Sequence, residues 1–424
     1  MEPVGPRMTG PGIRSWEFAR VLAGEHTVTI AAPAPTPETV AGFRVVEARR
    51  SRVEAELKKA DVLVVQGTVL DQYPALAASG LPLVVDLYDP YLLENLELHA
   101  GKQMPARTSI HDADLATLLD QAAAGDFFLC ASERQRHFWL GFLAAAGRVN
   151  PLTYEGDPAL EQLLAVVPFG LPDEPFPSGG EGGVAGLAEG DQLLLWWGGI
   201  WPWMDAETPL RALAQVAGDH PEARLFFFLN SAERTPAGRL AEELGLLDRS
   251  VFFRPWVDYE QRLRYLARAG LGISCHRAHV ETLFAFRTRI LDYLWAGLPM
   301  LLSRGDPLGE LVESNGAGLA CEPGDVGAVA AGMRGFLEDA ELRVRCSLAA
   351  TALSERFRWS RVTAPLVEFC RNPRPSADRG STRSGRRRAL RLAALGHKAY
   401  HSLREEGPAR LVARGYRYVR KRST

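Results

Sequence analysis

The chain has 424 residues, of which 46% are hydrophobic and 24% are charged, together with 40 Gly and 28 Pro. This ordinary globular composition excludes a fibrous repeat, a wholly disordered chain and a disulfide-stapled miniprotein. The net charge of −2 conceals an asymmetry, because residues 371–424 hold 16 Lys and Arg against 3 Asp and Glu. An acidic body therefore continues into a strongly basic tail.

The cysteines and the first residues bear on the compartment in which the protein works. Its five cysteines are dispersed and form no CxxC pair, which favours a reducing compartment and argues against a zinc site. No apolar run approaches the ~18 residues that span a bilayer. The first residues also lack the basic start and apolar middle of a signal peptide. The sequence therefore predicts a cytoplasmic protein.

The first half of the chain alternates short β-branched strands with helical stretches. We predict strands at 28–31, 62–65, 83–86 and 127–130, and helices at 14–23, 53–59 and 115–124. Continuous apolar strands between helices indicate a parallel sheet covered on both faces. A glycine-containing turn at 10–14 has no apolar strand before it. We therefore expect the true start to lie upstream of Met1, so that the first core strand is missing. The alternative is a fold that lacks this strand.

A second series of the same kind follows residue 190. Its predicted strands are 193–197, 223–229, 250–253, 271–274 and 300–302, and its predicted helices are 208–217, 240–244, 259–269, 287–296 and 326–338. A Pro- and Gly-rich stretch between the two series is typical of a linker. We predict an α/β protein with two Rossmann-like doubly wound domains facing a central cleft. The predicted parts are a first domain at 1–170, a linker at 171–190, a second domain at 191–370 and the basic tail at 371–424.

Ligands of such sheets bind at the carboxyl ends of the strands, where two glycine turns stand out. Gly10 and Gly12, followed by Arg14, precede the first predicted helix, and Gly198 and Gly199 follow the first strand of the second domain. Glycines allow a ligand to approach the backbone, and a helix N-terminus favours an anion. Ordinary βα turns are the alternative. Nearby aromatic side chains could stack on a ring or pack against the linker, and these are Trp196, Trp197, Trp201 and Trp203.

The segment 276–299 is the richest in chemistry. A helix starting near Phe286 would place Arg289 and Asp292, three residues apart, on one face. Arginines and a helix N-terminus suit a diphosphate, and a carboxylate further along suits ribose hydroxyls. The alternative is a surface Arg–Asp pair. His276 and His279 have a spacing compatible with metal ligation, but no third ligand is evident, so we predict no metal.

These features together resemble the glycosyltransferases of the GT-B fold, specifically retaining family 4. Residues 292–300 fit that family's "E-A-M-A-x-G-x-P-V" pattern. Residues 166–170 resemble its "V-I-P-N-G", and 316–318 followed by 323–325 resemble its late "G-x-G … P-x-D". The likeness spans about residues 5–370.

The resemblance implies a nucleotide-sugar donor bound mainly by the second domain and an acceptor bound by the first. It implies retention of the anomeric configuration, no obligate metal and no cofactor beyond the donor. By position, Asp292 would hold the donor ribose and Glu281 would contact the transferred sugar. Backbone amides from Phe284 through Phe286 to Arg287 would meet the diphosphate.

Two departures from the family pattern shift the predicted roles. Glu281 lies too far from Asp292 for the family's usual acidic spacing, and Phe284 stands where the first Glu is expected. No basic residue follows the second domain's first strand, although the leaving diphosphate needs its charge stabilised. We therefore assign that role to Arg287 and Arg289, with Arg14 assisting across the cleft.

Asp89 follows a strand of the first domain and is predicted to orient the acceptor hydroxyl or to contact the donor sugar. The alternative is that it caps the helix before which it stands.

Residues 383–422 of the tail are basic and partly amphipathic. Such a pattern favours an anionic membrane surface, which fits a lipid-linked acceptor at the inner face of the cell membrane. A solvated tail is the alternative, and nucleic acid is not expected because no reader motif accompanies the charge. We predict a hexosyltransferase-type glycosyltransferase (EC 2.4) in cell-surface polysaccharide synthesis. The alternatives are a nucleotide-sugar epimerase of the same fold and a non-catalytic glycan- or nucleotide-binding scaffold.

Overall fold

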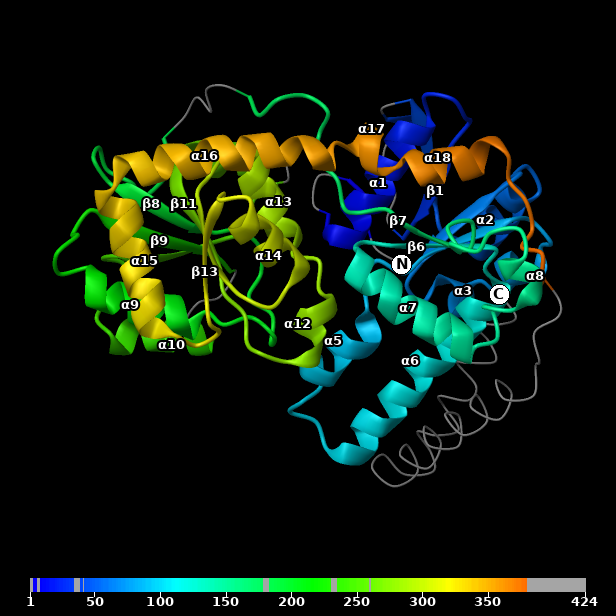
Figure 1. The fold of residues 1–424 in the computed structure, drawn as a ribbon, viewed down its shortest axis with the longest axis horizontal. Coiled ribbons are helices and arrows are strands. Elements are labelled where there is room, and N and C mark those ends of the chain that lie inside the picture. The colour runs from blue at the N-terminus through cyan, green and yellow to red at the C-terminus, as the bar shows by residue number, and fades with distance from the viewer. Residues whose placement is uncertain are drawn as a thin grey trace. The chain divides into compact units, whose positions relative to one another are not determined.

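The computed structural model describes residues 3–5, 8–33, 39–40, 42–177, 183–229, 235–258 and 261–379. The chain forms two compact units (Figure 1). Of the described residues, 22–167 and 365–379 belong to unit 1, and 3–21 and 168–364 belong to unit 2. In the part of the chain that the structure describes, no helix has the length and apolar character needed to cross a membrane.

Unit 2 is built on a six-stranded sheet in which every neighbouring pair is parallel. Its spatial order is β10-β9-β8-β11-β12-β13, so the chain first winds from β8 to one edge, returns to place β11 beside β8, and then winds to the other edge. The boundary between β8 and β11 is the topological switch point at which doubly wound sheets bind ligands. The strands are β8 (Gln192–Trp196), β9 (Ala223–Phe228), β10 (Val251–Arg254), β11 (Ala269–Ser274), β12 (Met300–Ser303) and β13 (Gly318–Cys321).

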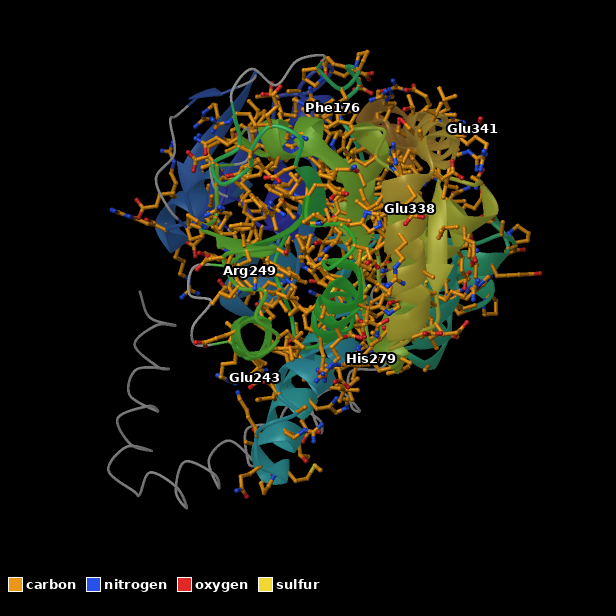
Figure 2. All side chains as sticks on the ribbon, turned by 90° about the vertical axis from the view of Figure 1, so that its left-hand side faces the viewer. Phe176, Glu243, Arg249, His279, Glu338 and Glu341 are labelled. Atoms are coloured by element: carbon orange, nitrogen blue, oxygen red, sulfur yellow. The ribbon has the colours of Figure 1, made fainter. Side chains whose placement is uncertain are left out.

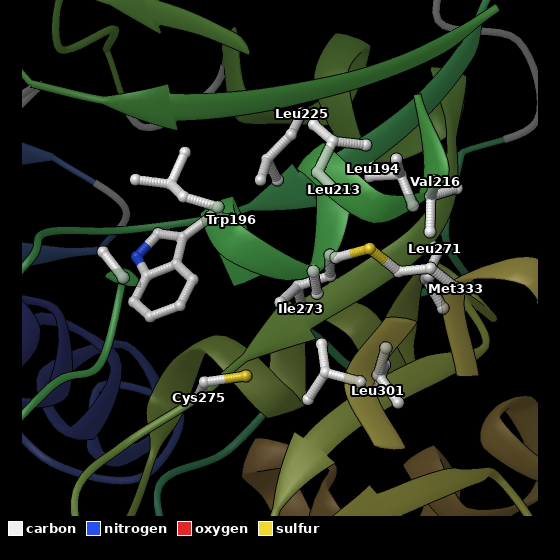
Figure 3. Packing of buried hydrophobic residues seen from close by; sticks show 14 of the residues in the cluster. Leu194, Trp196, Leu213, Val216, Leu225, Leu271, Ile273, Cys275, Leu301 and Met333 are labelled. Atoms are coloured by element: carbon white, nitrogen blue, oxygen red, sulfur yellow. The ribbon is translucent and has the colours of Figure 1, made fainter. Parts of the chain in front are cut away.

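Helices of unit 2 follow the strands in sequence. They are α9 (Glu207–Val216), α10 (Pro236–Glu243), α11 (Arg262–Arg268), α12 (Val280–Phe284), α13 (Thr288–Trp295), α14 (Pro307–Ser314), α15 (Val326–Glu338), α16 (Ala340–Ser354) and α17 (Trp359–Val362). Figure 2 draws the described side chains of the whole chain and labels Glu338, the last residue of α15. The main core of the unit lies between the sheet and α9, α10 and α15 (Figure 3).

Unit 1 contains a parallel sheet of order β4-β5-β6-β7 and a three-stranded sheet of order β1-β3-β2. Its strands are β1 (Thr29–Ala32), β2 (Thr39–Val40), β3 (Phe43–Glu47), β4 (Leu63–Gln66), β5 (Leu83–Asp86), β6 (Phe127–Cys130) and β7 (Leu164–Val166). Its helices are α2 (Arg50–Leu57), α3 (Val69–Gln72), α4 (Pro74–Ala78), α5 (Tyr91–Leu98), α6 (Met104–Ala124), α7 (Glu133–Ala145) and α8 (Pro151–Tyr154), with nearly all of α18 (Ala364–Arg371).

The division into units differs from the predicted domains at the N-terminus. All but the last residue of α1 (Gly10–Leu22) belongs to unit 2 rather than to the first domain. Two contacts explain this position: Arg14 donates a hydrogen bond to the Pro168 carbonyl over 2.9 Å, and the Phe18 ring packs edge-on against Trp359, with centroids 6.0 Å apart. The helix is therefore part of the packing of unit 2.

The division also differs at the C-terminal end, where residues 365–379 return to unit 1. Asp378 is buried and forms a two-pronged ion pair with the buried Arg148, with both N–O distances 2.9 Å. Asn150 also donates to Asp378, over 2.8 Å. The backbone N–H of Ser376 donates to Asp126 over 2.9 Å. These bonds fix the segment that leads into the basic tail, and the predicted membrane-binding residues 383–422 lie outside the described residues.

Candidate functional site

The turn that follows β8 is the centre of the candidate site. Gly198 has a φ of +87°, a left-handed conformation that side chains other than glycine rarely adopt. A Cβ atom at this position would stand 3.5 Å from a terminal guanidinium nitrogen of Arg289. The glycine turn predicted from the sequence therefore brings the backbone directly against an arginine of α13.

Arg289 is enclosed at this turn. Its Nη2 donates to the Gly199 carbonyl over 2.6 Å, and its guanidinium carbon lies 4.7 Å from the centre of the Trp196 ring. Only 7% of the residue is exposed, and Nη1 has no hydrogen-bond partner among the described residues. Burial, together with the neighbouring Arg287, lowers the pKa of Arg289 to about 10. The side chain is thus a buried cation at neutral pH, and the alternative of a surface Arg–Asp pair is wrong.

Tyr293 fixes α13 against the sheet one turn beyond Arg289. Its hydroxyl group accepts a hydrogen bond from the Trp197 backbone N–H over 2.7 Å. It donates towards the Leu195 carbonyl, 2.8 Å away, and lies 3.1 Å from the Ile273 carbonyl. The switch-point strands β8 and β11 are therefore joined to α13 by one buried phenol. The sequence analysis missed Tyr293, although residues four apart share a helix face and Arg289 had been singled out.

Arg287, the second arginine predicted to act on the diphosphate, forms an ion pair with Glu281, the predicted acidic residue. Arg287 donates from Nη1 and Nη2 to the two carboxylate oxygens of Glu281, over 2.8 and 2.6 Å. Glu281 is fully buried, and the Nε of Arg287 is buried without a hydrogen-bond partner in the described part of the chain. His279 lies at the start of α12 (Figure 2), with Nδ1 3.6 Å from the same carboxylate. The carboxylate thus orients the guanidinium of Arg287.

The helix predicted to start near Phe286 is α13, and a separate short helix, α12, precedes it. Phe284 is the last residue of α12, α13 begins at Thr288, and Ala285 between them is extended. The break aligns with the Glu281–Arg287 pair, which spans it. Phe286 lies in this connection and packs towards Phe357, with ring centroids 6.4 Å apart. The first N–H groups of α13 lack intrahelical partners by helix geometry, as a diphosphate site requires.

Part of unit 2 matches a known protein family. Residues 184–352 match the model of the family described as glycosyl transferases group 1. The match lies within unit 2 and includes its six-stranded sheet. A search of curated proteins finds no sequence match to the chain.

Solved glycosyltransferase structures share the fold of this chain. HepE from Anabaena, in complex with UDP-glucose, has a TM-score of 0.64 at 14% identity over 88% of this chain and 100% of that one. WaaG, from lipopolysaccharide biosynthesis, has a TM-score of 0.61 at 17% identity over 89% and 97%. Sucrose-phosphate synthase from Thermosynechococcus elongatus has a TM-score of 0.61 at 13% identity over 86% and 93%. The predicted GT-B fold is confirmed, and the chain is a glycosyltransferase.

Asp292 of this glycosyltransferase is engaged by another cation. The Nε of Arg262, on α11, lies 3.3 Å from its carboxylate, and Arg262 is itself buried. Burial raises the pKa of Asp292, although Arg262 and a hydrogen bond from the Trp197 side chain oppose that rise. The predicted contact of Asp292 with a ribose stays a prediction. Nothing in the sequence pattern pointed to Arg262, because its pairing depends on how α11 packs.

Gly10, Gly12 and Arg14, the donor-binding residues predicted near the N-terminus, all lie in α1. Gly10 begins α1, and a Cβ atom on Gly12 would stand 2.6 Å from the Pro3 carbonyl oxygen, so close packing requires a glycine there. Arg14 is fully buried, with its guanidinium carbon 4.4 Å from the centre of the Phe18 ring. Its predicted assistance to the diphosphate stays a prediction.

Asp89 lies in unit 1, whereas the arginines and Glu281 lie in unit 2. The residue that caps α5 is Pro90, with no side-chain hydrogen bond at the cap. Asp89 directly precedes this cap, and its alternative role at the start of the helix stays a prediction. Its predicted role towards the acceptor stays a prediction.

The histidines considered for metal binding have other partners in the glycosyltransferase. His276 is buried, with Nε2 3.2 Å from Asp306. The other oxygen of Asp306 accepts from the Leu308 and Gly309 backbone and so caps α14. Among the described residues, no three His, Cys, Asp or Glu side chains gather as a metal-ligand set. Asp306 follows strand β12, so the rule of strand carboxyl ends would have found it.

The ring partners of Trp196 and Trp197 lie on the neighbouring strand β9. Trp196 lies against Phe227, with centroids 5.4 Å apart, and Trp197 lies against Phe228 at 4.6 Å. The linker contacts Trp295, whose Nε1 donates to the Glu174 carbonyl over 3.0 Å. Trp196 and Trp197 thus pack against the sheet, and the expected packing of these tryptophans on the linker stays a prediction.

Proposed function

We propose that this glycosyltransferase moves a sugar from a nucleoside diphosphate donor to a glycan or lipid-linked acceptor in cell-surface polysaccharide synthesis. The proposal rests mainly on Arg289, a buried cation with an unpaired nitrogen at the switch point. Isolated buried charges are costly, so they are found paired or holding a ligand of opposite charge. Burial lowers the pKa of Arg289, and the neighbouring like charge of Arg287 lowers it further. A diphosphate would pair with Arg289 and accept from the Nε of Arg287, which has no partner among the described residues, while Glu281 keeps the other two nitrogens of Arg287.

The chemistry follows from those two cations. The bond between the anomeric carbon and the phosphate oxygen breaks, and its electron pair passes to the diphosphate. Arg287 and Arg289 stabilise the charge that develops there. The acceptor hydroxyl bonds to the anomeric carbon on the face that the diphosphate leaves, and its proton passes to a phosphate oxygen. This path retains the anomeric configuration, and the two cations carry out the neutralisation that other transferases assign to a metal ion.

Similar structures support the choice of donor class. HepE binds UDP-glucose, and its fold is shared over most of this chain. We extend the donor class to this protein and leave the base and the sugar to experiment. The acceptor is assigned to unit 1, with Asp89 orienting its hydroxyl. A location at the inner face of the cell membrane follows from the basic residues 383–422.

The test is incubation of the purified protein with a panel of nucleotide sugars. We expect slow release of nucleoside diphosphate from one donor, unchanged by EDTA, and faster release with a sugar acceptor. NMR of the product should show the donor's anomeric configuration. An epimerase would instead return an altered sugar still attached to its nucleotide, and a binding scaffold would release nothing. Either result would refute the proposed transfer.

A further inference from the structure

Two exposed indoles adjoin the glycine turn. The chain has nine tryptophans, all in the part that the structure describes, and only Trp201 and Trp256 are exposed, at 50% and 42%. They come from different strand ends, because Trp201 follows β8 and Trp256 follows β10. A Cβ atom on Gly199 would stand 3.2 Å from Trp201 Nε1 and 3.6 Å from Trp256 Cζ2. Both rings therefore reach the same glycine.

Trp201 is held in a fixed orientation. Its ring stacks on the buried Trp203, with centroids 5.7 Å apart and an angle of 11° between the planes. The carbonyl of Trp203 accepts from the Arg277 backbone N–H over 3.1 Å, which joins this loop to the chain after β11. Exposing half of an indole forgoes apolar burial. A rigid, exposed aromatic face is what a stacking ligand requires.

The same glycine connects the indoles to the phosphate site. The Gly199 carbonyl accepts from Arg289, while its α-carbon faces Trp201 and Trp256. A nucleoside diphosphate carries its flat base one ribose away from its phosphates. A site that places cations and indoles on adjacent sides of one residue matches that arrangement. An isolated sugar ring would match the indoles but leave the cations without a partner.

We propose that Trp201 and Trp256 form the platform on which the nucleobase of the donor stacks. This inference rests on the proposed function and identifies the side chains that bind the non-reacting end of the donor. Stacking tolerates any base, because every base has a π-face. The indoles therefore supply affinity for the nucleotide, whereas Arg289 supplies affinity for its phosphates.

Calorimetric titration with UDP, GDP, ADP and inorganic pyrophosphate tests the platform. For the nucleotide that binds tightest to the wild-type protein, Trp201→Ala should weaken binding about tenfold, while pyrophosphate affinity stays unchanged. Trp201→Phe should retain most of the affinity, and Trp256→Ala should act in the same direction as Trp201→Ala. Leu348→Ala, which removes another exposed apolar side chain of unit 2, is the control and should change neither affinity. Thermal unfolding of each variant checks its fold.

The outcomes separate the two proposals. Unchanged nucleotide affinity in both tryptophan variants overturns the platform alone. Equal losses for nucleotide and pyrophosphate also overturn it, because the indoles would then act through the phosphate site. A wild-type protein that binds none of the nucleotides overturns the proposed function as well as the platform.

Discussion

The guanidinium group of Arg289 donates a hydrogen bond to the carbonyl oxygen of Gly199 over 2.6 Å. This contact ties the arginine of α13 to the turn after β8, across the switch point of the sheet. The Nη1 atom has no hydrogen-bond partner among the described residues. The switch point therefore carries a buried cation with one donor available to a ligand.

Replacing Arg289 by alanine should lower sugar transfer by about a hundredfold or more, because removal of one preorganised charge-stabilising group costs that much. The fold should persist, since the change deletes an uncompensated buried charge. Steady-state release of nucleoside diphosphate and circular dichroism are the measurements. Arg304→Ala, at an exposed ion pair with Glu313 in the same unit, is the control. Unchanged turnover in Arg289→Ala would refute the assignment.

Glu281 and Arg287 should behave as one unit. If the carboxylate acts by orienting the guanidinium, the double variant Glu281→Gln/Arg287→Ala should transfer sugar no more slowly than Arg287→Ala alone. Arg287→Ala by itself should lower the free energy of unfolding by about 3 kcal/mol or more, because it leaves Glu281 buried and unpaired. Kinetics of the four-member cycle and urea unfolding give the two values. Strictly additive losses in activity would instead support the direct contact between Glu281 and the sugar implied by the family resemblance.

Tyr293 and Gly272 are in close contact, and a substitution of either residue should destabilise the protein. A Cβ atom on Gly272 would stand 2.6 Å from the Tyr293 ring, so Gly272→Ala should destabilise the protein by about 1–3 kcal/mol through overpacking. Tyr293→Phe should also lower the free energy of unfolding by about 1–3 kcal/mol, because the Trp197 N–H loses its acceptor. Thermal and urea unfolding measure both. Gly218→Ala, whose Cβ atom would meet nothing within 4 Å, is the matched control and should be close to wild type.

His220 should make the stability of the protein depend on pH. Burial would lower the pKa of His220, but hydrogen bonds to Glu222 and Glu338 outweigh burial and raise it. The stabilisation is therefore complete below the unfolded-state value of about 6.5 and is lost as the pH rises through the higher folded-state pKa. The melting temperature of the wild type should exceed that of His220→Gln most at about pH 6, with the gap closing towards about pH 8. A gap that widens with rising pH would contradict this linkage.

Asp378→Asn should weaken unit 1. The substitution leaves the buried Arg148 without its counter-ion, which costs about 3–5 kcal/mol when one partner of a buried pair is lost. Glu25→Gln, at an exposed pair with Arg371 in the same unit, should leave stability unchanged. Urea unfolding followed by limited proteolysis of unit 1 distinguishes the two. Equal stability of both variants would show that the residues after α18 contribute nothing to the unit.

Local pattern was sufficient for the strands that carry the site. The predicted strands at 83–86 and 127–130 coincide with β5 and β6, and 193–197 differs from β8 by one residue. Each is a short apolar run, and such runs are buried on both faces of a parallel sheet. By contrast β7 and β13 were not predicted, because Leu164–Val166 has only three residues and Gly318–Cys321 begins with a glycine and contains no β-branched residue.

The sequence identified the two arginines of the site, but their partners depend on tertiary packing. Arg287 and Arg289 were identified because they follow a strand end, and both are buried there. Their partners, the Glu281 carboxylate and the Gly199 carbonyl, depend on the break between α12 and α13. The sequence predicted the helix at 287–296, but the short α12 before it, which carries Glu281, was not predicted. Trp256 lies far along the chain from Trp201, and only the sheet order brings the two indoles together.

The return of residues 365–379 to unit 1 sets the order in which the two units can be completed during synthesis. Unit 2 has all its residues once the ribosome has passed Ala364. Most of unit 1 is made earlier, yet its ion pair between Arg148 and Asp378 cannot form until more than two hundred further residues have been translated. The half of the molecule that is made first is therefore finished last.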